Sequence, residues 1–249
     1  MQGIGTRRPV RRLMMRGLAL AATAVALTAC FGDYDGLRPT AGVDTQTRTA
    51  SLFGGMFTRR TFSEPTTMPA EEVACRRRLK RLDVTFEDIP RIDDGGGCGI
   101  AWPVKVSGLP RGVKLSPEGT FTCAMAEALA KWTDDELVPA ARLRYLSGVD
   151  TIRQGSSYSC RSIRGEGKLS AHATGDAIDI MDITLNSGRS IDVHKPGFFS
   201  FREKSLLSTV REDACPYFST VLGPGYNRDH RNHFHFDMMK RSSGYRVCK

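Results

Sequence analysis

The sequence contains no apolar run long enough to cross a membrane. Its longest apolar stretch, residues 18–29, has 12 residues and is interrupted by Thr23 and Thr28, whereas a membrane-spanning helix needs about 18 or more. Internal repeats are also absent, and 40% of the 249 residues are hydrophobic and 25% charged. This composition excludes a mainly disordered chain and a fibrous one, and the length suits one domain with additional segments or two small domains.

Acidic side chains are missing from residues 1–29, where five arginines precede the apolar stretch. The formal net charge of the chain is +9 and falls to +4 without this segment, so the charge gives no indication of nucleic acid as a partner. A basic region followed by a short apolar region is typical of a bacterial secretion signal. We interpret residues 1–29 as a signal peptide, and Arg11-Arg12 leaves both Sec and twin-arginine export open.

Cys30 directly follows this segment, in the order Leu27-Thr28-Ala29-Cys30. Small residues leading into a cysteine resemble a lipobox, in which the cysteine is lipidated and becomes the first residue of the mature protein. The alternative is an ordinary secretory signal followed by a cysteine without that role. We expect a lipid on Cys30, which would anchor the chain in the cell envelope, at the periplasmic or outer face of a bacterial membrane.

Serine and threonine are frequent in the next stretch, where they supply ten of the 28 residues 40–67. Such a composition is typical of a flexible linker. We therefore expect residues 30–68 to form a tether and residues 69–249 to form the folded domain, which Pro69 would open as an early helical residue. A domain of this length can bury a sizeable core.

Cysteine pairs of the C-x-x-C kind, which would indicate a zinc site made of cysteines, are absent. Six cysteines follow Cys30, and an even number in an exported protein indicates disulfides. They are Cys75, Cys98, Cys123, Cys160, Cys215 and Cys248. Six cysteines allow about 15 connectivities, which the sequence does not distinguish. As a working hypothesis we pair Cys75 with Cys98, Cys123 with Cys160 and Cys215 with Cys248.

Helical patterns precede strand patterns along the domain. We predict helices over residues 70–82, 121–131, 134–145 and 204–211, the first with a basic face that we interpret as solvated surface. We predict strands over residues 99–106, 177–185, 190–193 and 233–239, with a turn at Asn186-Ser187-Gly188. This distribution predicts an α+β domain with a small antiparallel sheet and helices packed around it.

Three of the five histidines fall within six residues, and they are His230, His233 and His235. Alternation along a strand would place His233, His235 and Asp237 on one face and Phe234 and its apolar neighbours on the other. Two imidazoles and a carboxylate on one face of an exported protein indicate a transition-metal site, for which zinc is the best fit.

The segment from His172 to Asp179 supplies a second half for such a site. Asp179 lies between Ile178 and Ile180, so its carboxylate would be flanked by core residues and would need a partner, because an unpaired buried charge is very costly. A metal is one such partner and an arginine is the other. Gly175 permits a turn that other residues resist, and His172 taken alone could equally be a solvated loop histidine.

These residues form the pattern His-x-x-Gly-x-Ala-x-Asp followed by His-x-His, which is similar to zinc-dependent peptidoglycan peptidases of the D-Ala-D-Ala carboxypeptidase and LAS type. Over about residues 75–248 the chain resembles the bacterial extensin-like C-terminal domain family. The strings that carry this resemblance are Gly155–Arg161, Leu169–Gly175, Thr220–Asn227 and His233–Asp237. Ala171 departs from the acidic residue expected at its position, which affects no metal ligand.

The resemblance implies an LAS- or hedgehog-like metallopeptidase fold, stabilised by disulfides. It also implies one zinc ion held by His172, Asp179 and His235, a set of three protein ligands that leaves a fourth position for water. Arg161 and Ser170 match positions that contact substrate in the relatives, although each could have only a structural role.

Related carboxypeptidases carry a glutamate as general base at the position of Asn232, so that version of the mechanism is absent. The arrangement His230-x-x-His233-x-His235 instead resembles the murein endopeptidase variant. On this resemblance His233 is the general base and His230 an auxiliary group.

The sequence and the resemblance together predict an exported zinc peptidase that hydrolyses amide bonds in the peptide stems of peptidoglycan. Two other functions stay open. One is a zinc-stabilised wall-binding module without turnover, and the other is a structural envelope lipoprotein.

Overall fold

The computed structural model describes residues 67–194, 196 and 200–249. The predicted signal peptide, the predicted lipid on Cys30 and nearly all of the predicted tether fall outside these residues. Within them, no helix has both the length and the apolar character that crossing a bilayer requires. The described residues form a domain of mixed α and β structure.

The main sheet contains nine strands and is therefore larger than the small sheet that the sequence predicted. Its order is β1-β4-β5-β6-β7-β10-β9-β11, with β8 paired to β7. It is mixed rather than antiparallel, because β5 pairs with β6 and β9 with β11 in parallel. The strands span Thr85–Asp88 (β1), Pro103–Leu109 (β4), Val113–Thr122 (β5), Val149–Ser156 (β6), Ala177–Leu185 (β7), Ser190–Asp192 (β8), Thr220–Leu222 (β9), Phe234–Asp237 (β10) and Val247–Cys248 (β11). A separate hairpin joins Ile92–Gly95 (β2) to Cys98–Ile100 (β3).

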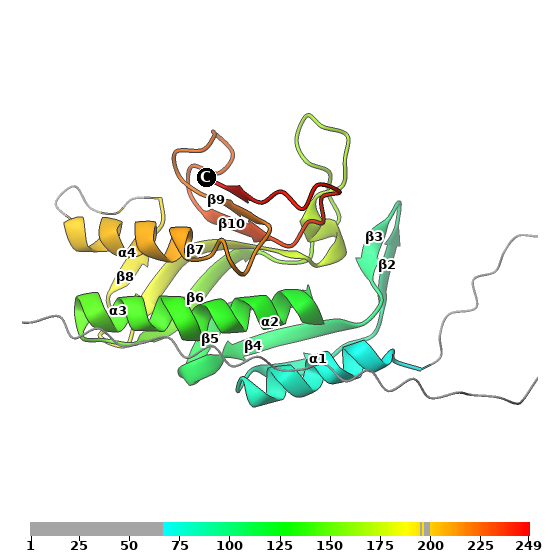
Figure 1. The fold of residues 1–249 in the computed structure, drawn as a ribbon, viewed down its shortest axis with the longest axis horizontal. Helices are drawn as coiled ribbons and strands as arrows, with labels where there is room; N and C mark the ends of the chain where they lie inside the picture. Colours follow the sequence, from blue (N-terminus) through cyan, green and yellow to red (C-terminus); the bar gives the residue numbers. More distant parts are fainter. Residues whose placement is uncertain (1–66, 195, 197–199) are drawn as a thin grey trace, which may run out of the picture. The chain divides into compact units, whose positions relative to one another are not determined.

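The α-helices of the described residues pack on this sheet and on one another. They span Ala70–Arg81 (α1), Cys123–Trp132 (α2), Val138–Tyr145 (α3) and Phe201–Glu212 (α4). Figure 1 shows α2, α3 and α4 lying across the near face of the sheet. The hydroxyl of Thr122 caps α2 by accepting a hydrogen bond from the backbone N–H of Met125, so this helix begins two residues later than predicted. A π-helical turn at residues 133–137 joins α2 to α3, and the two predicted helices form one continuous helical run.

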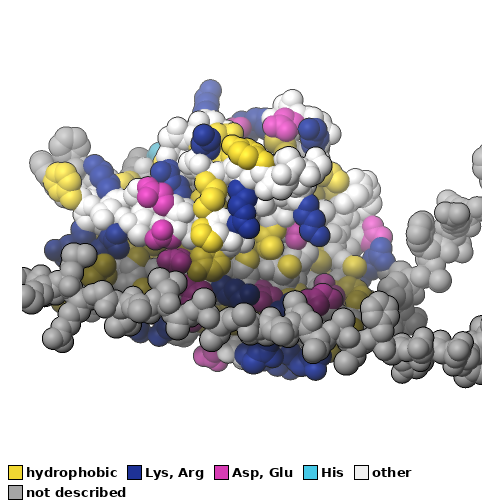
Figure 2. All heavy atoms as spheres, viewed as in Figure 1, with side chains coloured by type: hydrophobic (Ala, Val, Ile, Leu, Met, Phe, Trp, Pro, Cys, Tyr) yellow, Lys and Arg dark blue, Asp and Glu magenta, His cyan; other side chains and the backbone are white. Residues whose placement is uncertain are grey.

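Aromatic side chains fill the space between the helices and the sheet. Trp132 donates its indole N–H to the backbone carbonyl of Val210 in α4 at 2.9 Å, and its ring meets Phe236 of β10 edge-on at 5.2 Å. Phe234 and Phe236 thereby occupy the core face of β10, which directs His235 to the opposite face of the sheet. Figure 2 views the helix-covered face, where basic, acidic and hydrophobic side chains are mixed and almost no histidine is visible.

The six described cysteines form three disulfides, of which only one was paired correctly from the sequence. The bonds join Cys75 to Cys123, Cys98 to Cys160 and Cys215 to Cys248. The predicted pairs Cys75–Cys98 and Cys123–Cys160 were wrong, because tertiary packing brings distant segments together. α1 packs on α2, where Cys123 is the first residue, and β3 packs beside the short helix at residues 171–174, next to the segment that carries Cys160.

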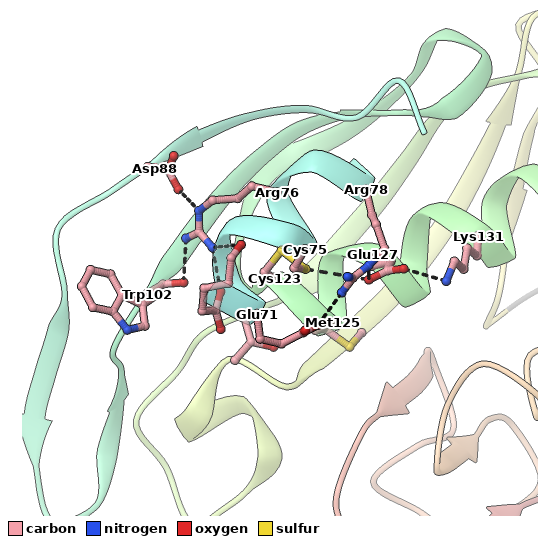
Figure 3. Close-up of a disulfide and its surroundings, with 12 residues drawn as sticks. Glu71, Cys75, Arg76, Arg78, Asp88, Trp102, Cys123, Met125, Glu127 and Lys131 are labelled. Carbon is pink, nitrogen blue, oxygen red and sulfur yellow. Dashed lines mark hydrogen bonds and ion pairs between the residues drawn. A yellow bond between two sulfur atoms is a disulfide. The ribbon is translucent and has the colours of Figure 1, made fainter. Parts of the chain in front are cut away.

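Charged side chains surround the Cys75–Cys123 bridge (Figure 3). The carboxylate of Glu127 in α2 accepts hydrogen bonds from Arg78 of α1 at 2.9 Å and from Lys131 at 2.7 Å. Burial opposes the ionisation of Glu127, but these two cations hold its pKa below the usual value. Part of the basic face predicted for residues 70–82 therefore links α1 to α2 instead of forming solvated surface.

Candidate metal centre

The pairing of β7 with β10 places Asp179 directly opposite His235. Ile178 and Ile180 point into the core and are fully buried, so alternation along β7 turns Asp179 to the face away from the helices. His235 is turned to the same face by its neighbours in β10. The sheet thus brings an imidazole and a carboxylate together from segments 56 residues apart, with His235 Nδ1 2.9 Å from Asp179 Oδ1.

His172 reaches this pair from a short 3-10 helix at residues 171–174. The Ser170 hydroxyl caps this helix by accepting a hydrogen bond from the backbone N–H of His172. Gly175 ends it at φ +70°, and a Cβ there would lie 2.2 Å from Cδ1 of Ile100, so the turn needs glycine for both its backbone conformation and its close packing. The loop is thereby fixed with His172 only 1% exposed.

The candidate cluster therefore comprises His172, Asp179 and His235, each offering one ligand atom. Nε2 of His172 lies 3.2 Å from Oδ1 of Asp179 and 3.2 Å from Nδ1 of His235. With metal–ligand bonds of about 2.0–2.1 Å in tetrahedral geometry, ligand atoms are separated by roughly 3.3 Å. The spacing and the nitrogen and oxygen donors both fit a zinc ion.

The second nitrogen of each histidine is held by an acceptor. Nδ1 of His172 lies 2.6 Å from the carbonyl oxygen of Ser157, and Nε2 of His235 lies 3.0 Å from Oδ2 of Asp237. When both imidazoles are neutral, as metal binding requires, a hydrogen on each of these outer nitrogens leaves Nε2 of His172 and Nδ1 of His235 with lone pairs directed at the centre. Carbonyl and carboxylate partners of this kind orient histidines that bind metals.

Asp179 has the arginine partner that the sequence left open beside a metal. While its Oδ1 faces the imidazoles, its Oδ2 accepts a hydrogen bond from Nη2 of Arg161 at 3.1 Å. Burial opposes the ionisation of Asp179, but its close contacts with the imidazoles of His172 and His235 hold its pKa far below the usual value. Asp179 therefore contributes a negative charge to the centre.

The pKa of His235 is shifted in the opposite direction, upward from its usual value. Burial disfavours its charged form, but hydrogen bonds to Asp179 and Asp237 outweigh burial and raise the pKa of His235 to about 9. In the protein without metal, the imidazole is therefore protonated at neutral pH, with the proton on Nδ1 between His172 and Asp179. The surrounding groups therefore stabilise a positive charge at this position.

His233 lies immediately before β10 and beside the cluster. Its Nε2 is 3.5 Å from Oδ1 of Asp179, and its Nδ1 is 3.0 Å from Oδ1 of Asn232. Donation from Nδ1 to Asn232 leaves the Nε2 lone pair directed at the centre. Burial lowers the pKa of His233, so this imidazole is neutral and can accept a proton at neutral pH.

His230 completes a row of imidazoles on this side. Its ring centroid is 5.4 Å from that of His233 and 5.5 Å from that of His235. The side-chain oxygen of Asn227 accepts hydrogen bonds from the backbone N–H of His230 at 3.0 Å and from its Nδ1 at 2.7 Å. Burial, together with the neighbouring imidazoles, lowers the pKa of His230 to about 4.

An open groove of about 940 Å³ contains the cluster, with one wall from residues 161–171 and the other from residues 220–241. Arg164 and Asp229 connect the walls through an ion pair of 3.2 Å, and Figure 1 shows the two loops rising from the same side of the domain. Arg161 and Ser170 both line the groove. The Arg161 side chain is 44% exposed, so it can contact a ligand while it holds Asp179.

The residues that orient the histidines were not predicted from the sequence. Asp237 was placed on the correct face by alternation, and its position two residues after His235 was the available signal. The roles of Asn227 and Asn232 as partners of His230 and His233 carried no signal beyond proximity in sequence. The carbonyl of Ser157 could not have been identified, because any residue provides the same backbone oxygen.

A family model described as the extensin-like protein C-terminus matches residues 73–249. The match covers well over half of the chain, including every residue of the candidate centre, and the chain therefore belongs to this family. No match was found among curated proteins or among solved structures.

Proposed function

We propose that this extensin-like domain is a zinc-dependent peptidase that hydrolyses amide bonds in the peptide stems of peptidoglycan. The observation that carries the proposal is the convergence of three ligand atoms, from His172, Asp179 and His235, within an open groove. Three protein ligands with one accessible side are typical of catalytic zinc sites, whereas structural sites are closed by four. The outer partners of both histidines add support, because they orient the ligand nitrogens inward.

When bound, zinc would polarise a scissile carbonyl and make a water molecule more acidic. The protein's own contribution to proton transfer would come from His233. Its Nε2 faces the centre, and its lowered pKa keeps it neutral, so it can accept a proton from the attacking water and return it to the leaving amine. Asn232, which replaces the glutamate of related carboxypeptidases, would then hold the tautomer of His233 instead of acting as a base.

Arg161 and His230 would position the substrate. Nη1 of Arg161 contacts the Ser156 hydroxyl and Nη2 contacts Asp179, so the guanidinium is fixed at the groove while its exposed edge could bind a peptide carboxylate. His230 lies next to His233 and could donate a hydrogen bond to the substrate or stabilise the charge that His233 acquires. The Ser170 hydroxyl already caps the His172 helix, which favours a positioning role for this residue.

Mass spectrometry of purified peptidoglycan before and after incubation with the zinc-loaded protein tests this function. Shortened or uncrosslinked stem peptides, absent with a His172→Ala control, are the expected result. Unchanged fragments together with co-sedimentation of the protein and the wall would refute the peptidase and favour a wall-binding module.

A further inference from the structure

Three large apolar side chains at one end of the domain are almost fully exposed. Among the described residues, Leu143, Leu146 and Phe201 are the large hydrophobic residues with more than three quarters of their surface accessible, at 79%, 95% and 77%. Leu143 and Leu146 lie at the end of α3, and Phe201 is the first residue of α4. Figure 1 shows these two helix ends at the same end of the domain, and we call these three residues the apolar tip.

Contacts between α3 and α4 hold the apolar tip together. The guanidinium of Arg202, next to Phe201, lies over the ring of Tyr145 at 5.7 Å from its centroid. Arg144 donates hydrogen bonds to Ser205 at 3.0 Å and to Thr209 at 2.6 Å. The tip therefore combines apolar side chains from two helix ends in one supported surface.

Leu146 has an unusual backbone for its residue type. It ends α3 in the left-handed region at φ +53°, where glycine or asparagine is usually found because a side chain with a Cβ is strained there. At 95% exposure its side chain contributes nothing to the core that would offset this strain. A leucine that is both strained and solvent-exposed indicates a contact outside the domain.

Arginines surround the apolar tip. Arg142 and Arg144 lie beside the two leucines in the sequence of α3, Arg202 follows Phe201, and the guanidinium of Arg189 also lies over the Tyr145 ring, 5.9 Å from its centroid. The carboxylate of Glu203 lies among them and accepts a hydrogen bond from Arg189 at 3.2 Å. The surface around the tip thus has a clear excess of positive charge.

We propose that the apolar tip docks on the surface of an anionic phospholipid bilayer. Exposed leucine and phenylalanine side chains with adjacent arginines match the two layers of such a surface, since the apolar groups enter the acyl boundary and the guanidinium groups bind lipid phosphates. Charge complementarity therefore favours a bilayer over an apolar protein surface. This inference is independent of the metal and of the proposed peptidase activity.

The position of the tip sets the distance between a docked bilayer and the groove. β7 carries Asp179 of the candidate metal centre near its start. It ends at Leu185, just before the turn that leads to Arg189. Six residues of strand correspond to roughly 20 Å. A bilayer bound at the tip would therefore lie on the order of 20 Å from Asp179 along β7, and the groove would stay clear of the lipid surface.

Tryptophan reporters in the mature full-length chain test the docking. Leu146→Trp and Leu143→Trp place a fluorophore in the tip, and Val73→Trp places one at a partly exposed position on α1 as the matched control. The probe is a vesicle of anionic phospholipid with brominated acyl chains, and the wild-type signal of Trp102 and Trp132 is subtracted. Anything else that attaches the chain to the vesicle is common to all variants, so the difference between positions reports the tip.

We expect quenching of at least twofold at positions 146 and 143, little at position 73, and loss of the effect in neutral vesicles or at high salt. Arg189→Gln combined with Arg202→Gln should weaken the quenching in anionic vesicles. Equal quenching at all three positions, or none at any, would overturn the proposal. It would also be overturned if the wild-type protein dimerised without vesicles and Leu146→Ser abolished the dimer, because the occupant of the tip would then be a second copy of the chain.

Discussion

At the scale of single residues, the protonation state of His235 determines the charge of the candidate centre when no metal is bound. The imidazole lies between the carboxylates of Asp179 and Asp237, which raise its pKa to about 9 from an ordinary value of 6.5. A metal bound at Nδ1 would replace this proton. Metal binding should therefore release a proton and weaken as the pH falls.

The stability of the metal-free protein should depend on pH in a definite direction. Because the folded-state pKa of His235 is raised, its stabilisation is fully present below about pH 6.5 and is lost as the pH rises through about 9. We expect the free energy of unfolding in chelator to fall by an amount on the order of a few kcal/mol between these values. Thermal melts with chelator should show this decline, and His235→Gln should remove it.

The exposed histidine His194 provides the control for this measurement. His194→Gln should leave the decline intact, and excess zinc should abolish or reverse it, because the metal takes the place of the proton. Melting temperatures in chelator that do not change between pH 6.5 and 9 would show that His235 is not held between two charged carboxylates.

Asp237 should act through His235 without contacting the metal itself. Asp237→Asn keeps the size of the side chain but removes the charge that orients Nε2 of His235. We expect zinc affinity to fall about 10- to 100-fold, as is typical when the outer partner of a metal-binding histidine is lost. Competition with a chromophoric chelator measures this affinity. Asp150→Asn, a partly exposed aspartate in β6, should leave it unchanged, and an unchanged affinity in Asp237→Asn would remove Asp237 from the centre.

At the scale of elements, the site depends on strand alternation and on one loop. Alternation was readable in the sequence, and β7 and β10 carry Asp179 and His235 on the face that the pattern predicted. The loop before β7 depends on Gly175, whose positive φ and contact with Ile100 leave no room for a Cβ. The position of His172 therefore depends on a glycine that has no side chain to offer as a metal ligand.

Gly175→Ala should displace His172 and disrupt the centre. A Cβ at this position would come within 2.2 Å of Ile100, so we expect a lower melting temperature and loss of most of the bound zinc. Gly188→Ala is the matched control, because its φ is also positive, at +82°, but its surroundings are open. The control should lose about 1 kcal/mol of stability and keep its zinc. Normal zinc content in Gly175→Ala would contradict the role assigned to this turn.

The sequence indicated which residues come together in the candidate cluster better than it indicated the sheet around them. β5 was not recognised as a strand because it contains Pro117 and Gly119, which usually interrupt strands. β1 carries too few apolar residues to show alternation. The pairing of the first four cysteines was wrong because it depends on how α1 packs on α2 and how β3 lies beside the 171–174 helix. None of these contacts leaves a periodic trace in the sequence.

At the scale of the whole molecule, the predicted lipid anchor would let the domain act on the wall from a membrane. Cys30→Ser tests the predicted anchor, since it removes the thiol that would be lipidated. We expect this variant to appear as soluble or uncleaved protein, and cell fractionation with comparison of gel mobility measures the change. Fractionation and mobility identical to wild type would mean that Cys30 carries no lipid.

The proposed enzyme requires that only one of the two histidines His233 and His235 binds the metal. His233 and His235 are two residues apart, and both imidazoles lie within 3.5 Å of Oδ1 of Asp179. A closed site would use both with His172 and Asp179, whereas a catalytic site keeps His233 free to move a proton. The central claim therefore depends on a difference between two neighbouring residues of the same type.

Zinc content measured beside muropeptide hydrolysis, for His233→Ala and His235→Ala, tests this claim most directly. We predict that His235→Ala loses both zinc and activity. His233→Ala should retain about one zinc per chain while turnover falls by about 10²- to 10⁴-fold, the usual contribution of a general base. If His233→Ala loses zinc as completely as His235→Ala, the site is closed and structural, and the peptidase account is contradicted.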